Sequence, residues 1–151
     1  MSARERLADM GVTLPAVAAP LAAYVPAVRT GNLVYTSGQL PLEGGEPTHF
    51  GKVGEEVTPE GGKAAARTCA LNALAAIDAL VGIDSVVRVV KVVGFVASAP
   101  GFTGQPGVVN GASDFLGEVF GEDGAHARSA VGVASLPLDV PVEVELIVEV
   151  A

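Results

Sequence analysis

The clearest pattern in the chain is an alternation of apolar and acidic residues close to its C-terminal end. Every second position is apolar, at Val142, Val144, Leu146, Val148 and Val150, and Glu143, Glu145 and Glu149 lie between them. Because successive side chains of a strand point to opposite faces, this period of two predicts a half-buried strand over residues 140–150. A β-rich run over residues 128–135 precedes it, and Leu136-Pro137-Leu138-Asp139 is expected to join the two strands as a hairpin.

Two other segments have the signals of helices. Thr58-Pro59-Glu60 indicates a helix start, since Thr can cap, Pro fits the first helical position and Glu suits the positive end of the helix dipole. An Ala-rich stretch over residues 64–80 continues this helix, and Gly82 is expected to end it. A second helix is predicted over residues 108–120, with Gly121 at its end.

Two earlier regions supply further strands. Two β-rich runs between Tyr24 and Gln39 flank Thr30-Gly31-Asn32, and this Gly-Asn pair predicts a hairpin because both residues tolerate positive φ. A Val-rich run over residues 86–96 predicts a strand between the two helices.

The remaining segments are expected to be loops or an irregular arm. Residues 41–57 and 98–106 are rich in Gly and Pro, and the first of these loops is expected to carry a short edge strand near Lys52-Val53. Residues 1–20 are expected to form a short helix and an arm. The whole order predicts an α+β fold over residues 1–151, a single domain with two helices on one face of a mixed sheet.

Composition adds an expectation of self-association. Half of the 151 residues are apolar and only 17% are charged, which suggests that partner subunits cover some apolar surface. The net charge of −8 and the scatter of only nine basic residues argue against nucleic acid or an anionic membrane as a partner.

Cysteine and histidine are too sparse for a metal site. Cys69 is the single cysteine, and His49 and His126 lie far apart, so we expect no disulfide, no metal and no cofactor. Cys69 falls in the apolar stripe of the first helix and is predicted to be a core thiol. Pro15 and Pro20 interrupt the apolar stretch near the N-terminus, which argues against a signal peptide, and no apolar run is long enough to span a membrane. We therefore expect a cytoplasmic protein.

Four ordered segments carry a resemblance to a known family. The last strands contain Arg128-Ser129, Leu136-Pro137 and Glu143-Val144-Glu145; the first hairpin contains Tyr24-Val25, Gly31-Asn32 and Thr36-Ser37-Gly38-Gln39; the helices contain Ala66-Arg67 with Asn72, and Val109-Asn110 with Asp114-Phe115. From Tyr24 onward the sequence thus resembles the Rid family, also called the YjgF family.

The resemblance implies a fold, an assembly and an activity. It implies a chorismate-mutase-like fold, in which a ferredoxin-like mixed sheet carries two helices on one face. It also implies a homotrimer whose sheets form a central barrel with ligand clefts between subunits. The implied activity is hydrolysis of 2-imino and enamine acids to 2-keto acids and ammonia, without a metal. The longer 98–106 loop and the longer N-terminal arm indicate a divergent branch.

The resemblance also marks six candidate site residues. They are Tyr24, Ser37, Asn110, Arg128, Ala130 and Glu143. Arg128 suits a substrate carboxylate because a guanidinium offers two parallel donors. Glu143 could hold a water for attack on the imine carbon and take its proton. Ala130 stands where the family commonly has Cys.

Each candidate also has a simpler interpretation. Arg128 could be a surface arginine paired with an acid, and Glu143 a solvated strand residue. Ser37 could sit in a strand-end turn, Tyr24 could merely cover the hairpin, and Asn110 could bond backbone. Two further functions therefore stay open beside a deaminase. One is a small-carboxylate or keto-acid binding or regulatory protein without turnover, and the other is an endoribonuclease, which net acidity disfavours.

Overall fold

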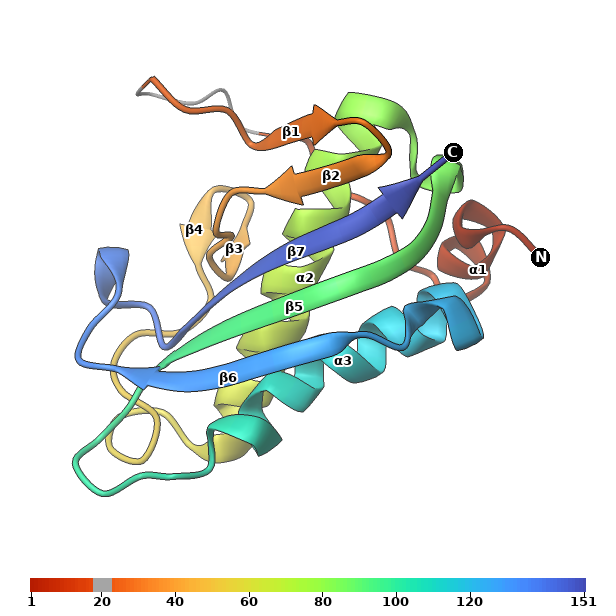
Figure 1. The fold of residues 1–151 in the computed structure, drawn as a ribbon. Coiled ribbons are helices and arrows are strands. Elements are labelled where there is room, and N and C mark those ends of the chain that lie inside the picture. The colour runs from red at the N-terminus through yellow and green to blue at the C-terminus, as the bar shows by residue number, and fades with distance from the viewer. Residues whose placement is uncertain (18–22) are drawn as a thin grey trace.

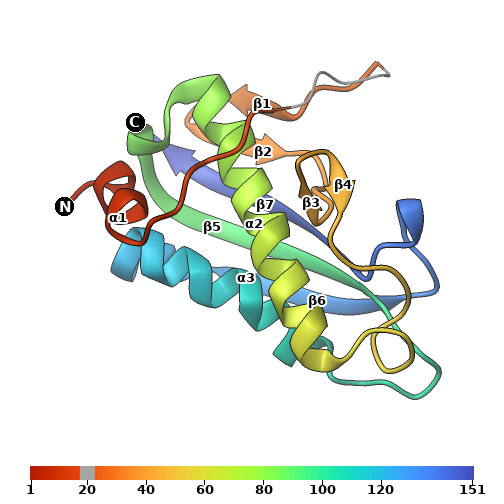
Figure 2. The ribbon, with the colours of Figure 1, turned by 180° about the vertical axis from the view of Figure 1, so that it is seen from behind.

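A five-stranded mixed sheet forms the centre of the chain, as a computed structural model covering residues 1–17 and 23–151 shows (Figure 1). The strands are β1 (Ala27–Thr30), β2 (Leu33–Thr36), β5 (Val86–Ala97), β6 (Ala127–Val133) and β7 (Val142–Val150), in the spatial order β1-β2-β7-β5-β6. Strands β5 and β6 are parallel, and the other neighbours are antiparallel. Both long helices cover one face of this sheet (Figure 2). The predicted α+β class is therefore confirmed.

The last two strands do not form the predicted hairpin. Strand β5 lies between β6 and β7, so the chain crosses the end of β5 to reach β7. The crossing contains a short 3-10 turn at Pro137–Asp139, in which Leu138 and Asp139 both have φ near 58°. Sequence proximity alone suggested the hairpin, and the pairing that formed instead gives β7 two strand neighbours and a central place in the sheet.

The first hairpin forms as predicted, and the loop after it holds a second one. Strands β1 and β2 pair through Gly31-Asn32, with Gly31 at φ 55°. Strands β3 (Leu42–Glu43) and β4 (Glu46–Pro47) pair through Gly44-Gly45, a turn whose two positive φ angles suit glycine. The edge strand expected near Lys52-Val53 is reduced to isolated bridges from Val53 to Val57 and Ser98.

The two long helices begin and end on the local signals. Helix α2 (Pro59–Val81) starts where the Thr58 hydroxyl accepts from the Gly61 backbone N–H at 3.0 Å, and Gly82 ends it with φ 82°. Helix α3 (Gln105–Phe120) starts three residues before the predicted Val108. Pro106 was assigned to the loop but lies in the first turn, where a missing N–H costs nothing.

The core lies between this helix layer and the sheet. The buried face of β7 meets Leu74 and Ile77 of α2 and Phe115 of α3 in one apolar cluster, and Cys69 is fully buried there as predicted. Helix α2 is long and apolar enough to cross a membrane, but half of its most apolar window is buried within the fold. The same properties belong to a core helix, so they are weak support for a membrane span.

The opposite face of the sheet carries no helix within the described residues. Val28, Tyr35 and Val131 are exposed there, and Leu33, Val93, Phe95 and Ile147 are only partly buried. Glu143, Glu145 and Glu149 of β7 lie among them. We call this surface the open face; its apolar content is unusual for a surface that only water covers.

The N-terminal arm is tied to the far ends of the helices. Helix α1 (Ala3–Asp9) begins with a capping box between Ser2 and Glu5. Arg6 Nη1 donates to the Val119 carbonyl at the end of α3 over 3.2 Å, and the Arg4 backbone N–H donates to Asp84 Oδ1 over 3.0 Å. Residues 18–20 of the predicted arm lie outside the described residues.

Candidate functional site

Arg128 lies on the helix-covered face of the sheet, at the edge strand β6. It pairs with Val92 of β5, whose side chain is buried under the helices. Arg128 Nη1 donates to Asn110 Oδ1 over 2.7 Å and to Ser113 Oγ over 3.2 Å. Both partners belong to α3, so the helix holds the guanidinium in place.

Arg128 has no acidic partner in the described part of the chain. The ion pairs there join Arg4 to Asp78, Lys63 to Asp114 and Arg67 to Glu118. Although the chain has 17 acids and only nine basic residues, the described residues give this partly buried arginine no carboxylate partner. The interpretation of Arg128 as a surface arginine paired with an acid is therefore wrong, as far as partners among residues 1–17 and 23–151 are concerned. Its charge remains available to an anionic ligand.

Two residues that sequence reasoning missed extend the Arg128 cluster. Ser113 Oγ lies 2.9 Å from His126 Nε2, and His126 Nδ1 lies 2.6 Å from the Gly124 carbonyl oxygen. The spacing held a signal for this arrangement. Asn110 and Ser113 are three apart and share a helix face. His126 lies two residues before Arg128, directly ahead of strand β6, where an extended backbone would point both side chains to the same side.

Ala130 follows Arg128 on the same side of β6. It pairs with Gly94 of β5 and packs, partly buried, against the core. Position 94 has no room for a side chain, because a Cβ there would lie 2.4 Å from a methyl group of Val109. The close approach of α3 at this point brings Asn110, the next residue, to Arg128.

Glu143 lies on the open face, at the start of β7. It pairs with Phe95 and is partly buried. Burial raises the pKa of the Glu143 carboxyl, and the neighbouring Glu145 charge raises this pKa further. Gly38 lies directly against the carboxylate, since a Cβ at Gly38 would be 2.0 Å from Glu143 Oε2. The absence of a side chain at Gly38 thus leaves room for the Glu143 carboxylate. The sequence motif did not reveal this role of Gly38.

Ser37 and Tyr24 lie beside the Glu143 group. Ser37 precedes Gly38, and its hydroxyl donates to the Val25 carbonyl over 2.6 Å. This hydrogen bond ties the end of β2 to the segment that carries Tyr24. Tyr24 is 60% exposed, so among the described residues it lies open to solvent.

The structure thus divides the six predicted residues into two groups. Asn110, Arg128 and Ala130 face the helices, whereas Tyr24, Ser37 and Glu143 lie at the end of β2 and on the open face. Strands β6 and β7 are also separated by β5, which places them about 10 Å apart. Arg128 and Glu143 of one chain therefore cannot contact one ligand of a few carbon atoms.

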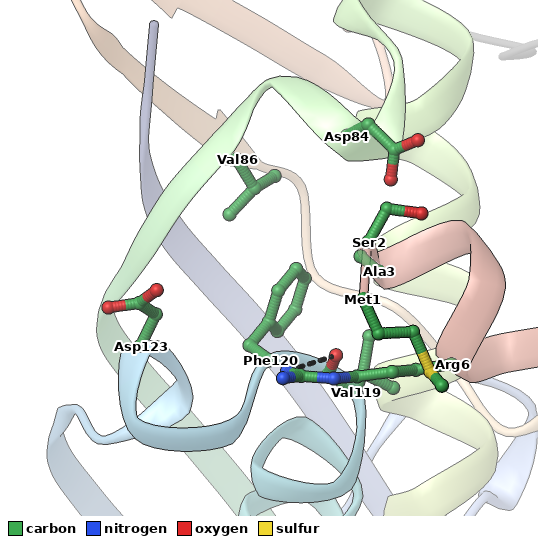
Figure 3. Close-up of a pocket in the computed structure, with 9 residues that line it drawn as sticks. All are labelled: Met1, Ser2, Ala3, Arg6, Asp84, Val86, Val119, Phe120 and Asp123. Atoms are coloured by element: carbon green, nitrogen blue, oxygen red, sulfur yellow. Dashed lines mark hydrogen bonds between the residues drawn. The ribbon is translucent and has the colours of Figure 1, made fainter.

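Two hollows of the described surface lie away from both groups. One is a cavity of about 190 Å³ between α1 and the end of α3. Arg6, which lines it, donates a hydrogen bond to the Val119 carbonyl (Figure 3). A groove of about 340 Å³ between α2 and α3 is lined by the ion pairs Lys63–Asp114 and Arg67–Glu118. The first lies where the N-terminal arm packs against the helices, and the second lies on the outer surface of the helices. Neither is lined by any of the six candidate site residues.

Comparisons with known proteins extend over nearly the whole chain. Residues 15–150 match the family described as Endoribonuclease L-PSP. Protein TCP17 of Trypanosoma cruzi is 47% identical over 145 residues, which cover 95% of this chain and 91% of that protein.

Solved structures are similar to two different degrees. A protein of unknown function from Agrobacterium tumefaciens is 45% identical, with a TM-score of 0.92 over 99% of this chain and 92% of its own. Escherichia coli TdcF with bound serine is 25% identical, with a TM-score of 0.65 over 92% of this chain and 96% of its own. The fold of this chain is therefore more similar to that of the Agrobacterium tumefaciens protein than to that of TdcF.

Proposed function

Because this chain belongs to the Endoribonuclease L-PSP family, also known as the Rid or YjgF family, we propose that it hydrolyses reactive 2-imino and enamine acids to 2-keto acids and ammonia. One observation carries this proposal: Arg128 is a partly buried cation without a carboxylate partner in the described chain. Every substrate of this class has a carboxylate, and a guanidinium binds it with two parallel donors. Serine, which TdcF binds, carries the same group.

Besides a cation for the carboxylate, the reaction needs a group that accepts a proton from the attacking water, and Glu143 supplies it. Water attacks the carbon of the protonated imine while the Glu143 carboxylate accepts one of its protons, and the resulting tetrahedral carbon carries a hydroxyl and an amino group. Glu143 returns this proton to the nitrogen, and ammonia leaves as the keto group forms, while the hydroxyl proton passes to the Glu143 carboxylate. The raised pKa of Glu143 supports this exchange, because a carboxylate of higher pKa is a stronger base toward water.

The two groups complete one site only across subunits. We propose that Arg128, Asn110 and Ala130 of one chain face Tyr24, Ser37 and Glu143 of a second chain in a homotrimer. The opposite faces of the two groups support this arrangement, and the apolar open face supports packing of the sheets into a central barrel. We also propose that residues 1–151 act as one domain in the cytoplasm, without cofactor, nucleic acid or membrane.

A second candidate function is binding of a keto acid without turnover. Ala130 favours it, because the family commonly has Cys at that position and an alanine offers neither donor nor nucleophile. An endoribonuclease is less well supported, since the net charge of −8 repels a phosphate backbone.

Turnover separates the two candidates. Freshly generated 2-iminobutyrate should lose ammonia faster with the protein than without it, and keto-acid binding without acceleration would favour the second function. Arg128→Ala and Glu143→Gln should each be inactive. After unfolding and refolding together, the two variants should regain part of the activity, because mixed trimers contain sites with an intact residue from each chain. No recovery in refolded trimers would contradict a site between subunits.

A further inference from the structure

We propose that Ser113 and His126 are positioning residues for Arg128, which together hold its guanidinium so that one edge faces the carboxylate of the ligand. The inference rests on the proposed function, since it takes Arg128 as the carboxylate-binding group. It concerns a hydrogen-bonded chain that runs from the Gly124 carbonyl through His126 and Ser113 to Arg128.

With His126 in its neutral form, the two ends of this series of hydrogen bonds fix the direction of each bond in it. The Gly124 carbonyl can only accept, so His126 Nδ1, at 2.6 Å, carries the hydrogen. In the neutral imidazole, Nε2 then accepts the hydroxyl hydrogen of Ser113 over 2.9 Å. The oxygen of Ser113 keeps its lone pairs for Arg128 Nη1, which can only donate.

The hydrogen bonds to Asn110 and Ser113 occupy one side of the Arg128 guanidinium and leave its other side open. Nη1 has two hydrogens, and its acceptors are Asn110 Oδ1 and Ser113 Oγ. No residue in the described ranges accepts from Nε or Nη2 of Arg128, and no buried side-chain nitrogen there lacks a partner, so these atoms reach solvent. The Nε–Nη2 edge presents two parallel N–H groups, the arrangement that a carboxylate accepts.

The chemistry of the partners explains why the cluster suits a binding site. Asn110, Ser113 and His126 hold Arg128 through an amide, a hydroxyl and an imidazole, none of which is a carboxylate. A carboxylate would fix the side chain equally well but would neutralise the charge and compete with the ligand. Neutral acceptors orient the cation and leave its attraction for an anion intact.

Gly124, which accepts the last of these hydrogen bonds, is a buried part of the fold. Gly124 ends the short 3-10 turn Gly121–Gly124 that follows α3. It is buried against that helix, because a Cβ at Gly124 would lie 2.5 Å from the Leu116 carbonyl oxygen. His126 is therefore held by a turn that packs against α3.

A purely structural role is the competing explanation, and a double-mutant cycle distinguishes the two. Ser113→Ala should weaken 2-ketobutyrate binding about twofold to tenfold, the usual effect of losing one hydrogen bond. KM for 2-iminobutyrate should rise by the same factor with kcat nearly unchanged, because the lost contact acts on ground state and transition state alike. Ser113→Thr, which keeps the hydroxyl, should restore both values. In the Arg128→Ala protein, Ser113→Ala should have no further effect on binding.

His126→Ala provides a second route to the same answer if Ser113→Ala folds poorly. It should weaken binding in the same direction and add little to Ser113→Ala. Thr68→Ala, which removes a hydroxyl from the outer side of α2, should bind like the wild type. Calorimetry gives the affinities, and circular dichroism with light scattering checks fold and mass.

The outcomes separate this inference from the proposed function. Wild-type affinity in folded Ser113→Ala and His126→Ala, with affinity lost in Arg128→Ala, would overturn the positioning role alone. An equal loss from Ser113→Ala in the wild-type and Arg128→Ala backgrounds would overturn it as well, because the effect would not act through Arg128. A wild-type protein that binds keto acid but accelerates no hydrolysis would overturn the deaminase proposal and leave the binding cycle valid.

Discussion

Arg128→Ala should be the most damaging single change in the site while leaving the fold intact. The substitution removes a cation that has no carboxylate partner among the described residues, so no buried acid loses its counter-charge. Asn110 and Ser113 lose a donor, but both are only partly buried, and water can replace it. The free energy of unfolding should therefore change little.

The loss of affinity follows from the bonds that the free edge can make. A charge-assisted, bidentate carboxylate pair contributes about 1.5–3 kcal/mol. Since about 1.4 kcal/mol corresponds to a factor of ten, 2-ketobutyrate should bind about tenfold to hundredfold more weakly. No other described feature offsets this loss, because the net charge of −8 repels the anion. Arg128→Lys should rescue binding only in part, because an ammonium cannot offer two coplanar donors.

Arg67→Ala is the matched control, because it removes the same charge from the outer surface of α2. Arg67 is paired with Glu118 at 3.4 Å and lies over the Phe115 ring, so its loss should leave keto-acid binding unchanged. Calorimetry with 2-ketobutyrate and an ammonia-release assay measure both variants. If folded Arg128→Ala bound and turned over like the wild type, Arg128 would not be in the site and the deaminase proposal would fail.

Four further outcomes are expected. Glu143→Gln should keep keto-acid binding but lose turnover. It should also raise Tm at neutral pH, because the raised pKa of Glu143 means that the folded protein prefers the protonated carboxyl. The free energy of unfolding of the wild type therefore falls as pH rises from the ordinary pKa of a glutamate to the raised pKa of Glu143. That gain in Tm should disappear below about pH 4, and an equal gain at all pH values would contradict the assigned cause. Gly38→Ala should lower turnover by displacing Glu143, whereas Gly107→Ala, where a Cβ meets nothing within 4 Å, should not; equal activities would remove Gly38 from the site. Light scattering should give three times 15.1 kDa, and a mass near that of one chain would exclude the trimer. Dialysis against a chelator should leave turnover unchanged, and restoration of lost activity by zinc would show a metal requirement.

Local signals predicted the elements of this fold well. Thr58, Pro59 and Gly82 set the limits of α2 through capping and backbone preferences that act within a few residues. The alternation in β7 placed its buried and open faces correctly, because side chains of a strand alternate whatever its neighbours are. The hairpin at Gly44-Gly45 was missed because each of its strands is only two residues long.

The order of the strands and the division of the site could not be read from such signals. The position of β5 between β6 and β7 depends on pairing between distant segments, and so does the face on which Arg128 lies. The resemblance marked Arg128 and Glu143 by their places in a motif, but a motif contains no information about which side of a sheet each residue occupies. Ser113 and His126 were missed because they lie 13 residues apart and meet only through the return of the chain from α3 to β6.

The placement of Arg128 and Glu143 on opposite faces of one sheet has an evolutionary consequence. If each complete site takes one residue from each of two chains, selection acts on the two faces separately. After a gene duplication, one copy can lose Arg128 and the other can lose Glu143, provided that the two products assemble together. Relatives that lack one of these residues should therefore be sought in genomes that encode a second copy retaining it, where the pair would form an obligate hetero-oligomer.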